Sequence, residues 1–317
     1  MIQQVCLALL IALVMVRAPR AIASPAGRPA FWATVSGIVA LSTYGWPVPF
    51  DTYDTLLGGS NVITLVRDLA ATSAFWFFRE ALGRRAGGEG RIGSRWGLAL
   101  MFGSYIVPFL LIRDRGDTSK DFIIDRLDQT AVWLYGSAYM ATLVWLSVSS
   151  IINARRNWRG VQVVFTTGFA VTTVGCLIEI GFLTASHFGY GGDAFRYSAW
   201  NAAEIPFFLG LLIIMLGIGW TAIVLPIRHR LVVARASRYA VRHNLIERPT
   251  ITTYLGERRL IAHAQQVLVS TKNAQVRGDI DLTPAACAAL ERLRALISPD
   301  RAFTPRVIGG NGIGKAA

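Results

Sequence analysis

A charged pair inside an apolar segment constrains this chain more than any other feature of its sequence. Residues 61–82 (NVITLVRDLAATSAFWFFREAL) have the length of a membrane span, and Arg67 and Asp68 lie within it. A charged side chain in hydrocarbon costs roughly 2.5 kcal/mol or more, so such residues usually face a partner or a watery cavity. Neighbouring side chains point about 100° apart on a helix, so we expect each charge to find its partner on another segment.

The composition indicates a polytopic membrane protein. Hydrophobic residues make up 53% of the 317, charged residues only 16%, and the mean hydropathy is +0.44. A soluble domain carries closer to a quarter charged residues. The three cysteines are scattered and the four histidines lack the spacing of paired ligands, so we expect no disulfide framework, no metal and no cofactor.

Seven apolar segments predict an all-α bundle of seven transmembrane helices, with residues 1–226 as the membrane domain. The first lacks a positive charge before its apolar run, so we expect it to remain as a span rather than be cleaved as a signal peptide. The predicted spans are residues 2–16, 31–49, 62–78, 96–112, 131–152, 161–185 and 205–225.

Basic residues in the loops predict that the N-terminus is outside and the C-terminus inside, because Lys and Arg concentrate on the cytoplasmic side. One set of loops carries Arg17, Arg20, Arg28, Arg84, Arg85, Arg91, Arg95, Arg155, Arg156 and Arg159. The opposite loops carry fewer basic residues, namely Arg113, Arg115, Lys120, Arg126 and Arg196. Several aspartates in these loops offset their charge.

A stripe of small residues on the sixth span ends in a carboxylate. Gly168, Thr172, Gly175 and Cys176 recur at helical spacing before Glu179, which predicts a seam where another helix packs closely.

The helical rise places Glu179 at about the depth of Arg67. We therefore expect Arg67 to pair with Glu179, and Asp68 to face a polar cavity with Asn201 and Glu204 at its mouth. The alternative is that these groups only hold the bundle together, since no ladder of carboxylates continues inward as a proton or cation path would need.

The chain from residue 227 onward is strongly basic. It holds 15 Lys and Arg against 6 Asp and Glu, or +9 of the net +13. We expect residues 227–305 to form a helical cytoplasmic domain and residues 306–317 a flexible tail. One side of its first helix carries the basic residues Arg228, Arg235, Arg238 and Arg242. We expect this side to contact anionic lipid headgroups.

Two further helices are expected in this domain. Tyr254, Ile261, Ala264 and Leu268 form an apolar stripe on one of them. The last should begin with Thr283 as N-cap and Pro284 in its first turn. The basic residues are dispersed and no recognition helix stands out, so nucleic acid is not an expected partner.

Several features resemble a family of actinobacterial seven-helix integral membrane proteins with a cytoplasmic domain of unknown function, often labelled transporters. They are the Arg17-Ala18-Pro19-Arg20 sequence after a short first span, the Leu56-Leu57-Gly58-Gly59-Ser60-Asn61 loop, Tyr135 and Tyr139 on the fifth span, and a glycine-rich last span ending at Pro226. The resemblance covers roughly residues 1–230. It implies a bacterial plasma-membrane protein, with helix-turn-helix regulators as candidate partners.

We expect a non-enzymatic, multi-pass plasma-membrane protein that acts as a sensor or as a membrane anchor for a cytoplasmic regulatory protein. The alternative is a transporter of a small solute or ion that uses the charges of the third and sixth spans. A membrane enzyme is less expected, because the spans show no set of nucleophile, base and metal ligands.

Overall fold

Every regular element in the described part of the chain is a helix. The computed structural model describes residues 2–23, 27–85, 95–155, 160–190, 192–250, 253–254, 257–280 and 282–297. The chain divides into two compact units, Met1–Ala222 and Ile223–Ala317, which we call the bundle unit and the tail unit. The predicted flexible tail, residues 306–317, lies outside the described residues.

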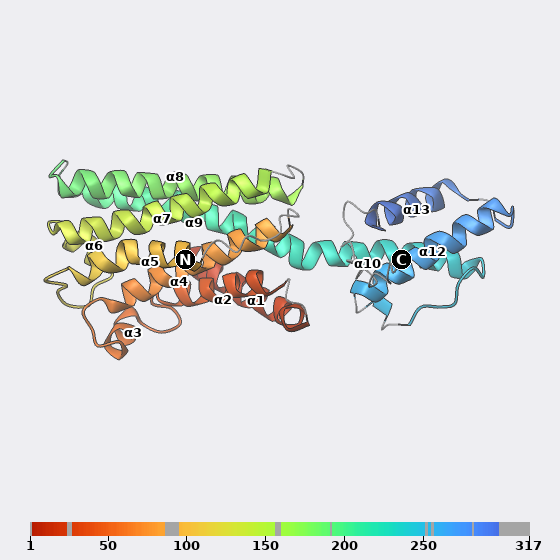
Figure 1. Ribbon diagram of the computed structural model, residues 1–317, viewed down its shortest axis with the longest axis horizontal. Coiled ribbons are helices and arrows are strands. Elements are labelled where there is room, and N and C mark those ends of the chain that lie inside the picture. The colour runs from red at the N-terminus through yellow and green to blue at the C-terminus, as the bar shows by residue number, and fades with distance from the viewer. Residues whose placement is uncertain are drawn as a thin grey trace, which may run out of the picture. The chain divides into compact units, whose positions relative to one another are not determined.

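The bundle unit contains a long helix at each of the seven predicted apolar segments (Figure 1). They are α1 (Ile2–Ala23), α2 (Arg28–Ser42), α4 (Val62–Arg85), α5 (Arg95–Leu110), α7 (Thr130–Arg155), α8 (Val161–His187) and α9 (Asp193–Gly219). Two short helices that were not predicted lie in the connections, α3 (Phe50–Leu56) and α6 (Phe122–Asp125).

Six of these helices pack in a closed ring. Going round it, α1 contacts α2, then come α4, α7, α8 and α9, and α9 contacts α1 again. Helix α5 packs against α7 and α4 on the outside of the ring. The ring encloses a core rich in aromatic side chains, including Phe75, Tyr135 and Phe169.

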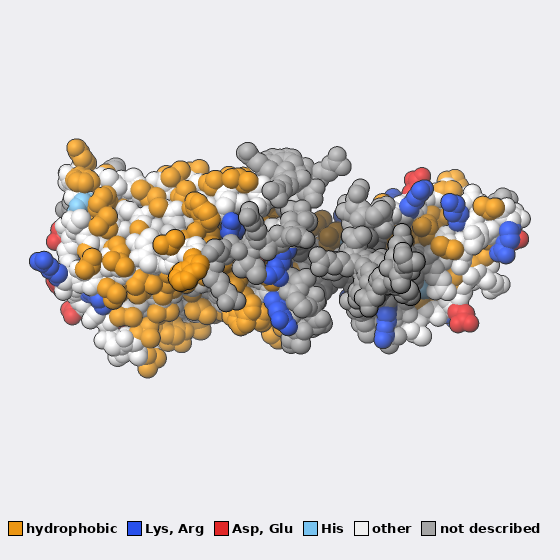
Figure 2. Space-filling view, viewed as in Figure 1, with side chains coloured by type: hydrophobic (Ala, Val, Ile, Leu, Met, Phe, Trp, Pro, Cys, Tyr) orange, Lys and Arg blue, Asp and Glu red, His pale blue; other side chains and the backbone are white. Residues whose placement is uncertain are grey.

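Three helical ranges are long and apolar enough to cross a bilayer, within the part of the chain that the structure describes, and the third continues beyond α9. They are Thr130–Ala154, Val161–His187 and Ala202–Arg242. Two more apolar helices are shorter, Ile2–Ala18 and Trp96–Leu110. Helix α2 has 15 residues, and α4 carries charged residues along its length. Hydrophobic side chains spread over the visible face of the bundle unit (Figure 2), as in a protein that contacts lipid. The count of seven spans and their orientation stay predictions.

Two helices have ends that differ clearly from those of the predicted apolar segments. The second span was expected to reach residue 49, but α2 ends at Ser42, because Gly45, Pro47 and Pro49 follow and do not support a helix. The last span was expected to begin at residue 205, but α9 begins at Asp193. Pro206 therefore lies inside α9 rather than in its first turn.

The small-residue stripe of α8 is a packing seam, as predicted, and its partner is α9. A Cβ atom added to Gly175 would lie 2.7 Å from the backbone nitrogen of Phe207, and one added to Gly168 would lie 2.6 Å from the Ile214 side chain. Only glycine allows the two helices to approach this closely.

The tail unit has a small core of its own. Its helices are α10 (Leu225–Arg242), α12 (Glu257–Val276) and α13 (Pro284–Ile297), and a π-helical turn, Trp220–Val224, precedes α10. Val233, Ala240, Ala264 and Leu293 are among the side chains that pack between the three helices. The predicted N-cap is confirmed, because the Ala286 amide donates to Thr283 Oγ1 at 3.3 Å.

Candidate functional site

Arg67 and Asp68 pair with each other on α4. Arg67 Nε donates to Asp68 Oδ1 at 3.1 Å, and the side chains are 16% and 1% exposed. The second carboxylate oxygen of Asp68 accepts a hydrogen bond from the hydroxyl of Tyr135 on α7. The expectation that each charge finds its partner on another segment is wrong for Arg67, because its long side chain turns back to the nearest carboxylate, whereas Asp68 also bonds to Tyr135 on another helix.

Tyrosines from two helices surround this carboxylate. Tyr105 on α5 donates to Thr72 Oγ1 at 3.1 Å, one turn along α4 from Asp68. The Tyr105 ring meets the rings of Tyr135 and Tyr139 edge to face, at centroid distances of 6.3 and 5.7 Å. Tyrosine suits this place, because its ring packs in an apolar core while its hydroxyl satisfies a polar group. Polar contacts thereby join α4 to both α5 and α7.

The predicted pairing of Arg67 with Glu179 is wrong, although the two residues lie at similar levels. Phe75 packs on Phe169 at 5.9 Å and Phe78 on Phe165 at 5.2 Å, so α4 and α8 run antiparallel. Continuing this register brings Arg67 level with Glu179. Glu179 is 8% exposed and has no hydrogen bond or ion pair among the described residues. The guanidinium instead meets the closer carboxylate, that of Asp68.

Asn201 and Glu204, expected at the mouth of a cavity, both fall inside α9. Glu204 accepts a hydrogen bond of 2.7 Å from Gln3 Nε2, which ties α9 to α1. The side chain of Asn201 is outside the described part. Asp68 does not face a polar cavity either, since it is fully buried against Arg67 and Tyr135.

A buried polar cluster at the N-terminal end of α4 was not predicted. The carboxylate of Asp54 accepts hydrogen bonds from the Asn61 and Ile63 amides, both at 2.9 Å, and from Thr118 Oγ1 at 2.6 Å. Asn61 donates through its side-chain amide to the carbonyls of Arg115 and Asp117 and accepts from the Ser119 amide. Asp54 and Asn61 are fully buried. The only sequence signal was Asn61 directly before an apolar run, in the position of a helix cap.

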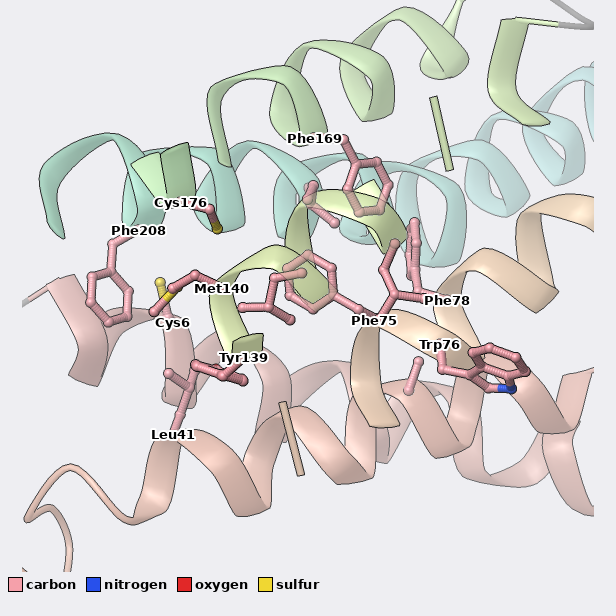
Figure 3. Packing of buried hydrophobic residues seen from close by; sticks show 14 of the residues in the cluster. Cys6, Leu41, Phe75, Trp76, Phe78, Tyr139, Met140, Phe169, Cys176 and Phe208 are labelled. Atoms are coloured by element: carbon pink, nitrogen blue, oxygen red, sulfur yellow. The ribbon is translucent and has the colours of Figure 1, made fainter. Parts of the chain in front are cut away.

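A pocket lies inside the ring of six helices, and each of the six contributes lining residues. Its cavity volume is about 100 Å³, and the wider space that includes its open mouth is about 790 Å³. Aromatic and aliphatic side chains line most of it, and Figure 3 shows three of them, Phe75, Phe78 and Phe169, packed together. Arg67 is the one charged residue in the lining that the structure describes.

The basic side chains predicted on the first tail helix are exposed. Arg228, Arg235, Arg238 and Arg242 face away from the buried residues Val233, Ala236 and Ala240 on α10. The opposite face of the helix is occupied by the core of the tail unit. The geometry leaves these four guanidinium groups accessible, and contact with lipid headgroups stays a prediction.

No group of three or more His, Cys, Asp or Glu residues could hold a metal ion in the ranges that the structure describes. The site consists instead of a buried Arg-Asp-Tyr group beside an apolar pocket. These residues can hold helices together and offer hydrogen-bond donors to a ligand.

Fold and site together define a helical protein with apolar helices of membrane-spanning length and a pocket inside a ring of helices. Comparisons with protein-family models, curated proteins and solved structures found no match to this chain. The resemblance to actinobacterial seven-helix proteins therefore stays a prediction.

Proposed function

We propose that this chain is a seven-span plasma-membrane protein, with its N-terminus outside and its tail unit inside, that acts as a sensor or as a membrane anchor for a cytoplasmic regulatory protein. The spans would be α1, α2, α4, α5, α7, α8 and α9. Most charges on α4 are compatible with a span, because Asp68 and Arg67 bond to each other and Arg84 bonds to Glu80 at 2.5 Å. The Arg79 guanidinium lies over the Trp76 and Trp145 rings, at 5.4 and 5.0 Å from their centres. The basic loops and tail support the orientation.

The observation that carries this proposal is the tail unit. It has its own core, so it is a folded module rather than a loose extension. Its first helix presents a row of exposed arginines that can bind anionic lipid headgroups or an acidic partner surface. A compact basic module that follows a membrane bundle suits docking at the cytoplasmic surface.

The test is crosslinking and affinity capture from membranes with three forms of the protein. We expect a specific cytoplasmic partner to be captured by the full chain and lost when residues 227–317 are deleted. The double variant Arg235→Glu/Arg238→Glu should also lose it. The matched control Arg277→Glu/Arg292→Glu changes exposed arginines of the same unit that lie off α10, and it should retain the partner. Absence of any partner in all forms would contradict the proposal.

Transport is the second candidate, and the buried carboxylate of Glu179, which has no partner among the residues that the structure describes, favours it. Such a group in a membrane helix can take up and release a proton. Proteoliposomes with a pH-sensitive dye inside test this directly. Proton flux that Glu179→Gln abolishes would favour transport. Absence of proton flux with both the unmodified protein and the variant would favour the sensor or anchor.

A further inference from the structure

We propose that the pocket inside the ring of helices binds a single-chain lipid carboxylate, with its head at Arg67 and its chain along the aromatic wall. This inference rests on the proposed membrane function and names the class of ligand that such a sensor would detect.

The first argument is the unused hydrogen-bonding capacity of Arg67. Only its Nε is bonded, to Asp68, so the terminal amino groups have no hydrogen-bond partner among the described residues. The guanidinium carbon lies 5.0 Å from the centre of the ring of Tyr44, which also lines the pocket, so the ring holds the group at the pocket wall. A guanidinium has five N–H donors and no acceptor, so the complementary head group must be an acceptor.

The second argument is a second donor in the lining of the same pocket. Tyr139 lines the pocket, and its hydroxyl bonds to no other side chain or carbonyl in the described ranges. A carboxylate has two oxygens and can accept from the guanidinium and the phenol together. A cationic head would be repelled, since the pocket lining shows no acidic side chain in the part that is described.

The third argument is the shape of the apolar part. Arg67, Ala71, Ala74 and Phe78 lie on one face of α4, and at 1.5 Å per residue they span roughly 16 Å. Ala71 and Ala74 are small, and Phe207 and Phe208 of α9 also line the pocket. A narrow apolar channel that starts at one guanidinium fits one acyl chain better than a two-chain phospholipid.

Charge also favours a carboxylate over a phosphate. Arg67 already shares its charge with Asp68, and no other cationic side chain lines the pocket in the described residues. The single partly neutralised guanidinium suits a head group of charge −1.

The probe is a palmitate analogue with a photoreactive diazirine at the end of its chain, added to the purified full chain in nanodiscs. We expect labelled peptides from α4 and α9. Palmitate should compete for labelling at concentrations at least roughly tenfold lower than methyl palmitate needs, as expected for loss of a charge-assisted hydrogen bond. Lysophosphatidic acid, with one chain and a phosphate, should compete less well than palmitate.

Two variants locate the site. Ala74→Leu fills the channel and should abolish labelling, whereas Ala81→Leu lies on the same helix outside the pocket lining and should label like the unmodified protein. Arg67→Gln/Asp68→Asn removes both charges together, and palmitate and its methyl ester should then compete equally. If that variant fails to fold, the ester comparison on the unmodified protein still decides.

Equal competition by methyl palmitate in the unmodified protein would overturn the proposal, as would labelling that survives Ala74→Leu. Stronger competition by lysophosphatidic acid would overturn the choice of a carboxylate. These readouts do not depend on the tail unit. Failure to bind the probe is thereby distinguishable from failure to capture a cytoplasmic partner.

Discussion

The hydroxyl of Tyr135 on α7 donates a hydrogen bond to the carboxylate of Asp68 on α4, and neither side chain is exposed to any measurable extent. This bond and the Arg67 pair together use both oxygens of the buried carboxylate. Removal of either donor leaves a buried acceptor unsatisfied, which costs more than the bond itself contributes.

Tyr135→Phe should therefore destabilise the bundle unit by about 1–3 kcal/mol. Unfolding of the purified protein in detergent, followed by heat or denaturant, measures this. Tyr139→Phe is the matched control, because it lies one turn along α7 and its hydroxyl bonds to no described group. Similar losses for the two variants would contradict the role of the Asp68 bond.

Gly175→Ala should separate α8 from α9. The added Cβ would lie 2.7 Å from a backbone nitrogen of Phe207, which cannot move aside like the end of a flexible side chain. Overpacking of this kind costs about 1–3 kcal/mol. Gly181→Ala on the same helix meets nothing within 4 Å, so it should leave the melting temperature unchanged or raise it. Equal melting temperatures for the two variants would contradict close packing of α8 against α9 at Gly175.

Asn61→Gly should loosen the connection between α5 and α6. Glycine accepts the positive φ of 61° at this residue, so the substitution removes the three side-chain hydrogen bonds without backbone strain. We expect faster hydrogen exchange in residues 113–120 and a loss of about 2 kcal/mol or more in stability. Ser60→Gly is the control, since Ser60 has the same φ and is exposed. Unchanged hydrogen exchange in the Asn61→Gly variant would show that the cluster is not needed to hold this connection.

His263 should make the tail unit sensitive to acid. Burial lowers the pKa of His263 below its usual value of 6.5, and its Nε2 lies 2.8 Å from Ser237 Oγ. Ser237 donates its own proton to the Val233 carbonyl, so the imidazole Nε2 is the donor in the Ser237 contact. The fold favours neutral imidazole, so its contribution is complete above pH 6.5 and is lost as pH falls below that value through the lowered pKa.

Hydrogen exchange of the α12 amides in the full chain, measured between neutral pH and about pH 5 and corrected for intrinsic rates, checks this expectation. Exchange should accelerate below pH 6.5 in the unmodified protein. The variant His263→Gln cannot titrate, and its corrected exchange should depend less on pH. Identical pH profiles for both proteins would contradict the role of His263.

Hydrophobic periodicity and helix-capping residues were enough to predict much of the fold. The apolar runs located all seven long helices of the bundle unit, and Thr283 and Pro284 located the start of α13. Both signals are local, because they depend on residues within a few positions of one another. The start of α9 was missed, since residues 193–204 are too polar to extend an apolar run even though they form a helix.

The site was harder to predict, because its contacts join distant parts of the chain. The sequence singled out Arg67 and Asp68, but the partner of Asp68 is Tyr135, 67 residues away. Glu179 was placed at the right level and given the wrong partner, since helical rise fixes depth and says nothing about which side chains meet. The Asp54 and Asn61 cluster depends on loop geometry that no periodic pattern reports.

Labelling of cysteines from one side of the membrane tests the central claim, a bundle with its tail unit in the cytoplasm, most directly. Among the free cysteines, Cys6 and Cys176 are buried and Cys287 on α13 is exposed. In bacterial cells that express the protein, a maleimide that cannot cross membranes should label Cys287 only after the cells are permeabilised. The variant Cys287→Ser/Lys120→Cys places the thiol in the opposite loop, where it should react in intact cells. Labelling of Cys287 in intact cells would contradict the account.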